Sequence, residues 1–130
     1  MDRQKRRLMR LLIPALFLSL GPVLSILAAK ELSAMSAIQD TDPTTLTWAS
    51  AQERLGPPET TEVFPLAPEL PEFRTHVPDA AGPEAVAARA PVREATWSLN
   101  DTHNRTIWFI ERDDAWRYLL HFDWEKGLEF

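Results

Sequence analysis

The chain contains no cysteine among its 130 residues. This absence excludes a disulfide-stapled scaffold, a thiolate metal site and a cysteine nucleophile. It also excludes the lipid-modified cysteine of a bacterial lipoprotein. Histidine is scarce, with three residues, and no nucleophile elbow, phosphate-binding loop or paired-histidine helix motif occurs. We therefore expect a non-catalytic protein that needs no cofactor.

Charge is distributed unevenly along the chain. Residues 1–30 contain six basic residues and one acidic residue, whereas residues 31–130 contain eight basic and eighteen acidic residues, a net charge of −10. Phosphates would repel such an acidic body, so nucleic acid is not an expected partner. The basic N-terminus needs a different explanation.

An uncharged stretch of nineteen residues, 11–29, follows the basic cluster. As a helix it would span roughly 28 Å, close to the thickness of the hydrocarbon core of a bilayer. Basic residues before such a stretch keep the N-terminus in the cytoplasm and send the following residues outward. We therefore predict a signal-anchor in residues 1–36, which holds the chain in the inner (plasma) membrane by a single pass with the C-terminal domain outside the cytoplasm.

A cleavable signal peptide is the alternative. Ala34-Met35-Ser36 offers small residues at the required spacing, although Lys30 and Glu31 separate it from the apolar stretch. Cleavage would release a periplasmic or secreted protein. In both cases the body leaves the cytoplasm.

The body begins, in our interpretation, after a linker at residues 37–43, and residues 44–130 form one domain. Thr47 is suited to cap a short helix whose apolar residues Trp48, Ala51 and Leu55 share one face. Gly56 and the two prolines after it end this helix. A helix of two turns is not stable alone, so it must pack on other elements.

Proline is concentrated in residues 57–93, which contain eight of the eleven prolines. Because proline cannot donate to a strand ladder, this pattern predicts a long loop rather than regular strands. We expect extended pieces around Val63-Phe64 and Phe73-Arg74, and one turn of helix from Gly82 to Arg89. A loop of this length is functional or disordered, and the sequence does not decide between the two.

The C-terminal part has the pattern of an antiparallel meander. Residues 95–100 alternate in polarity, residues 106–110 are apolar on both faces and therefore central, and aromatic or apolar residues alternate with polar ones over residues 116–124. Short turns connect these strands, and residues 128–130 would add an edge strand. The predicted fold is α+β: a short helix packed on a three- to four-stranded antiparallel meander sheet.

Together these features resemble the BamE (SmpA/OmlA-like) family of small bacterial envelope proteins. The resemblance consists of a helix ending in Leu55-Gly56-x-Pro58, a strand opening with Trp97, and a meander ending in Gly127-Leu128. It covers about residues 44–130 and implies a binding or assembly role in the envelope, without assigning any residue a function. The chain departs from the family in its missing lipoprotein cysteine, its single clear helix and its long loop.

One cluster of side chains suggests a metal site. His121 and Asp123 lie two residues apart on one strand, and the meander brings that strand near the turn that holds Asp101 and His103. Two imidazoles and two carboxylates are able to bind zinc or another divalent ion. The alternative is a polar outer face beside a solvated turn.

The aromatic residues suggest either a core or a binding surface. Eight of the twelve aromatic residues lie in residues 97–130, and the central strand is apolar on both faces, whereas one short helix covers only one face. Either the proline-rich segment covers the second face, or Trp108, Phe109 and Leu119 form a patch that binds a partner. The sequence thus predicts an interaction or assembly module that binds another envelope protein. The alternatives are a divalent-metal-binding protein and a small inner-membrane subunit that acts through its transmembrane helix.

Overall fold

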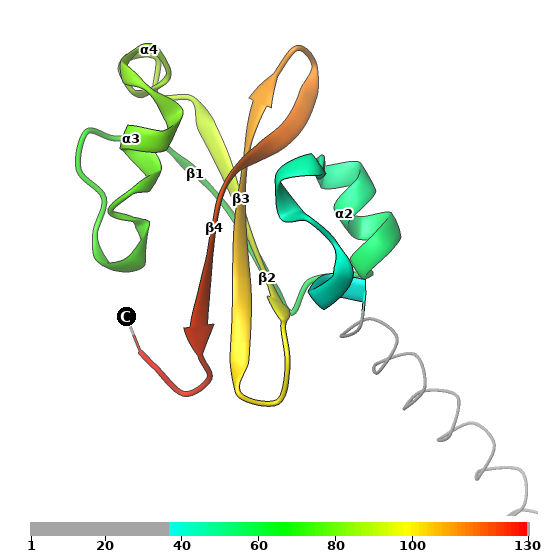
Figure 1. Ribbon diagram of the computed structural model, residues 1–130. Helices are drawn as coiled ribbons and strands as arrows, with labels where there is room; N and C mark the ends of the chain where they lie inside the picture. Colours follow the sequence, from blue (N-terminus) through cyan, green and yellow to red (C-terminus); the bar gives the residue numbers. More distant parts are fainter. Residues whose placement is uncertain (1–36, 130) are drawn as a thin grey trace, which may run out of the picture. The chain divides into compact units, whose positions relative to one another are not determined.

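The computed structural model of the protein describes residues 37–129 (Figure 1). This part of the chain is α+β, as the sequence predicts, and contains one four-stranded antiparallel sheet in the order β1-β2-β3-β4. The strands are β1 (Thr60–Pro65), β2 (Pro91–Ser98), β3 (His103–Arg112) and β4 (Ala115–Glu125). Each strand pairs with its neighbour in sequence, so β1 and β4 are the two edges of the sheet.

The first face of the sheet is covered by the helix α2 (Trp48–Leu55), which lies to one side of the strands in Figure 1. Thr47 caps this helix reciprocally with Ser50, and Gly56 ends it at a positive φ of 76°, as its sequence predicts. Ala51 and Leu55 are buried against Phe109 of β3. The short helix is thus stabilised by the sheet on which it packs.

Residues 37–43, interpreted as a linker from the sequence, pack in this layer as well. Ile38 is buried in the same core, and its backbone oxygen accepts a hydrogen bond from Arg105. The Gln39 side chain donates to the backbone oxygen of Leu99 over 2.8 Å. The short 3-10 helix η1 (Pro43–Thr45) then leads into α2. The apolar contact of Ile38 is the reason that this segment packs on the sheet.

The second face is covered by the proline-rich segment. This segment contains η2 (Glu72–Arg74), α3 (Val77–Ala81) and α4 (Pro83–Ala87), all on the opposite side of the sheet from α2 (Figure 1). Leu66 and Val77 are buried with Trp108 and Ile110 of β3. Of the two alternatives that the sequence leaves open, covering by the chain's own proline-rich segment is therefore the one observed.

A buried polar contact fixes this cover to the sheet. Both the Nε and an Nη atom of Arg74 donate to the carboxylate of Glu94, over 2.7 and 3.0 Å. The indole N–H of Trp108 donates to the same carboxylate over 2.8 Å, and the guanidinium of Arg74 lies over the ring of Phe64, 4.1 Å from its centroid. The carboxylate thus joins η2 to two strands.

Three details of the predicted secondary structure are wrong. The extended piece predicted around Val63-Phe64 is part of a regular strand, β1, in a stretch predicted to lack regular strands. An edge strand is possible there because Pro65 comes last in it, where a missing N–H is tolerated. Phe73 and Arg74 are in a 3-10 helix rather than an extended piece. The fourth strand is β1, and Leu128 and Glu129 of the predicted edge strand lie outside any strand.

A β-bulge divides β4 into two parts. Side chains that would share a face of an unbroken strand lie on opposite faces of the sheet before and after the bulge. The pairing with β3 shifts between Trp108 and Phe109, whose partners are Leu120 and Tyr118, so Leu119 is the extra residue. An unbroken strand would place alternate residues on one face throughout. Instead, Tyr118 packs on the α2 side of the sheet, whereas Leu120 packs on the side of the proline-rich segment.

Candidate functional site: the outer edge of strand β4

The outer edge of β4 is paired over only part of its length. At its start, Thr47 forms an antiparallel bridge with Arg117, and the N–H of Tyr118 donates to the backbone oxygen of Leu46 over 3.1 Å. Beyond the bulge, residues 119–123 have no backbone partner on this side within the described part of the chain. Such an edge exposes N–H and C=O groups that another strand can pair with.

An exposed aromatic side chain lies within this open stretch. Phe122 is 45% exposed, one of three large apolar side chains in residues 37–129 that are this exposed. It follows Leu120 and precedes Trp124 on the same face of β4. Trp124 contacts Phe73 at 6.3 Å between ring centroids and donates to the hydroxyl of Thr106. The neighbouring rings are thus held in place beside the edge.

The other face of the same stretch is polar. Arg105 donates twice to the carboxylate of Asp123, over 2.7 and 2.9 Å. This pairing lowers the pKa of Asp123 and raises the pKa of Arg105, so both groups stay charged near neutral pH. The open edge therefore has an apolar side and a charged side, which is the pattern that a partner strand with alternating side chains can complement.

His121 lies between these charges and is held by a tyrosine. Its Nδ1 atom is 2.7 Å from the hydroxyl of Tyr118. Burial lowers the pKa of His121, and the nearby guanidinium of Arg105 lowers it further, while Asp123 and Asp42 raise it. Burial also raises the pKa of Tyr118. The imidazole is therefore mostly neutral at pH 7.

The residues predicted to form a partner-binding patch are mostly core residues. Trp108 and Phe109 have no exposed surface, because they point to opposite faces of β3 and each face is covered by another layer. Leu119 is half-buried at the bulge of β4. The exposed aromatic residue of β4 is Phe122. The alternating pattern of β4 is visible in the sequence, but it does not show that Phe122 is more exposed than Leu120 and Trp124.

The predicted metal ligands are not assembled into a site. His121 and Asp123 share a face as predicted, but the Asp123 carboxylate is paired with Arg105. His103 Nδ1 is 2.8 Å from the Thr102 hydroxyl, and Asp101 is exposed in the turn. Within residues 37–129, no three histidine, aspartate or glutamate side chains form a group able to hold a metal ion.

The other sheet edge, β1, is less suited to binding a strand. It has only six residues, it places the charged Glu62 near its middle, and it ends in Pro65, which lacks an N–H. Val63 is 48% exposed there, but the remaining exposed side chains of β1 are polar or proline. Val63 is thus a control of similar exposure for experiments on Phe122.

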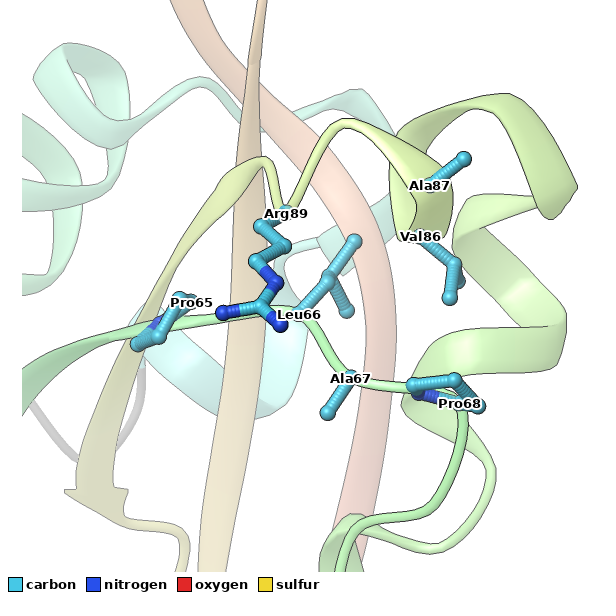
Figure 2. A pocket seen from close by; sticks show the side chains of 7 residues that line it. All are labelled: Pro65, Leu66, Ala67, Pro68, Val86, Ala87 and Arg89. Atoms are coloured by element: carbon cyan, nitrogen blue, oxygen red, sulfur yellow. The ribbon is translucent and has the colours of Figure 1, made fainter.

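An apolar pocket lies between the end of β1 and the helix α4, in the layer formed by the proline-rich segment. Its volume is about 390 Å³, and Figure 2 shows the side chains that line it, with those of Leu66 and Arg89 lying between Pro65 and Val86. Arg89 follows α4 at a positive φ of 50°. The pocket contains a single charged side chain and no pair of groups arranged for acid-base chemistry.

Comparison with known proteins provides no relative, since no protein-family model, curated protein or solved structure matches the chain. The resemblance to the BamE family therefore stays a prediction. No helix within residues 37–129 is long and apolar enough to cross a membrane. The predicted membrane segment, residues 11–29, lies outside the described residues.

Proposed function

We propose that the protein is a non-catalytic interaction module that binds an extended segment of a partner protein along residues 119–123 of β4. The observation that carries this proposal is the combination of an unpaired backbone edge with an exposed aromatic side chain, Phe122, on that edge. Added strands obtain affinity from main-chain hydrogen bonds and specificity from alternate side chains. Such binding needs no cofactor.

The surroundings of the edge support this binding mode. Both faces of the sheet are already covered by the chain's own layers, so the sheet faces offer a partner little apolar surface. The bulge at Leu119 and the contact of Leu46 with Tyr118 limit pairing to the open stretch. The edge is therefore the part of the sheet that is both apolar and accessible.

Residues 11–29 would place this module outside the cytoplasm, held by the membrane anchor or released after cleavage. Under the resemblance to BamE-like proteins, the partner would be another protein of the bacterial envelope. A tether to the membrane would raise the effective concentration of the module for partners on the same membrane.

Photocrosslinking tests this function. The photoreactive residue p-benzoylphenylalanine replaces Phe122 in the full-length chain, and Val63 on β1 is replaced in a matched control of similar exposure. We expect a defined crosslinked band from position 122 in intact cells of the native host, and a much weaker one from position 63.

Equal labelling from both edges, or no adduct from position 122 at normal expression, would contradict strand addition at β4. A second variant, Phe122→Asp, places a charge on the open edge without altering the covered faces. It should abolish crosslinking from a photoreactive residue at position 125, three residues further along β4, while the protein remains folded by circular dichroism.

A further inference from the structure

The guanidinium of Arg93 is held against two tryptophan rings on the α2 side of the sheet. Its Cζ atom lies 4.8 Å from the ring centroid of Trp48 and 4.9 Å from that of Trp116. Trp48 begins α2, and Trp116 lies near the start of β4. The bridge between Thr47 and Arg117 holds these two segments side by side. The side chain of Arg93 therefore extends from β2 across β3 toward β4.

This guanidinium has no acceptor for its N–H groups within residues 37–129. An arginine has five such donors. The Nε atom of Arg93 is buried without a hydrogen-bond partner, and the ion pairs of this part of the chain use other arginines. Glu111 shares this face of the sheet, opposite Trp116, but does not pair with Arg93. Stacking on the rings thus explains how Arg93 is packed, but it leaves a half-buried charge without the counter-charge that such a group needs.

The ligand that best fits this guanidinium is a single carboxylate. A planar carboxylate accepts two parallel hydrogen bonds from an arginine and continues the plane of the guanidinium, so it stays clear of rings that lie over that plane. The oxygens of a tetrahedral phosphate project out of the plane. Residues 31–130 also have a net charge of −10, which repels a dianion about twice as strongly as a monoanion.

From these observations we infer that Arg93, together with Trp48 and Trp116, is a binding site for a carboxylate of a partner polypeptide, from an acidic side chain or from a chain end. The rings hold the guanidinium without using its N–H donors, so little side-chain freedom is lost on binding. The site lies before the bulge of β4, apart from the open stretch beyond it. The inference therefore goes beyond the proposed function and does not depend on it.

NMR spectroscopy of the full-length protein in detergent tests this site, because an arginine Nε–H group has a resonance of its own. Arg93→Lys identifies the resonance of Arg93 by removing it. Titration with sodium acetate at pH 6 and constant ionic strength should shift this resonance until it saturates, with a dissociation constant on the order of 10 mM. Arg89, an exposed arginine that lies over no ring within the described residues, should show no saturable shift.

Two variants separate binding from packing. The indole N–H resonances of Trp48 and Trp116 report acetate binding when the arginine is absent. We expect Arg93→Lys to bind acetate about tenfold more weakly, because an ammonium group keeps the charge but lacks the planar fork. Trp116→Leu should also weaken binding, followed at the Arg93 resonance, because one of the rings that hold the guanidinium is lost.

The inference is overturned if the Arg93 resonance does not saturate, if Arg89 responds equally, or if Arg93→Lys binds acetate as well as the wild type does. Inorganic phosphate that binds as tightly as acetate would likewise exclude a site for carboxylates. Titration with N-acetylglycine and with the α-amide of N-acetylaspartate then distinguishes a chain end from an acidic side chain. Saturable binding of either one supports the inference and identifies the source, and binding of neither overturns it.

Discussion

At the residue scale, Glu94 is the side chain on which the second layer most depends. It is 13% exposed and accepts hydrogen bonds from Arg74 and from the indole of Trp108. Replacement by leucine leaves the half-buried guanidinium with Glu62 as its remaining acceptor and the buried indole N–H of Trp108 with none. We expect Glu94→Leu to lower the free energy of unfolding by about 2–4 kcal/mol, measured by urea denaturation.

The matched control is Glu62, which also pairs with Arg74 but is 62% exposed. Solvent screens this outer ion pair, so Glu62→Gln should cost less than about 1 kcal/mol. Similar losses for both variants would mean that burial of the Glu94 carboxylate is not what gives it its effect.

His121 should make stability depend on pH. Because burial and the Arg105 charge lower its pKa in the folded protein below the usual 6.5, the unfolded chain binds more protons between the two values. The contribution of this group to stability is therefore complete above about pH 6.5 and decreases as the pH falls toward the folded pKa. Urea denaturation from pH 5 to 8 should show a steeper rise with pH for the wild type than for His121→Gln. Parallel curves for the two proteins would contradict this assignment.

At the scale of elements, the capping of α2 should have a measurable effect because the helix has only eight residues. The Thr47 hydroxyl accepts from the N–H of Ser50 over 3.1 Å, and the Ser50 hydroxyl accepts from the N–H of Thr47 over 2.9 Å. We expect Thr47→Ala to lower the free energy of unfolding by about 1 kcal/mol, whereas Thr47→Ser, which keeps the hydroxyl, should retain most of it. Equal stability of the two variants would show that the cap contributes nothing.

The same elements show what the sequence could predict and what it could not. The helix with its cap and its Gly56 terminus, and the central position of the apolar residues 106–110, depend on local patterns and are confirmed. The position of β1 depends on a tertiary partner, since proline is tolerated only at the edge of a sheet. The bulge at Leu119 leaves the alternating pattern of β4 unchanged while reversing its facing, so the exposure of Phe122 could not be read from the sequence.

At the scale of the whole molecule, experiments can decide whether function depends on the body or on the N-terminal segment, residues 1–36. We expect full-length protein to remain in the membrane fraction after extraction with alkaline carbonate, because an uncleaved segment at residues 11–29 would anchor it. Exchange of residues 1–36 for an unrelated anchor should preserve crosslinking from position 122. Loss of crosslinking after this exchange would instead favour a subunit that acts through its transmembrane helix.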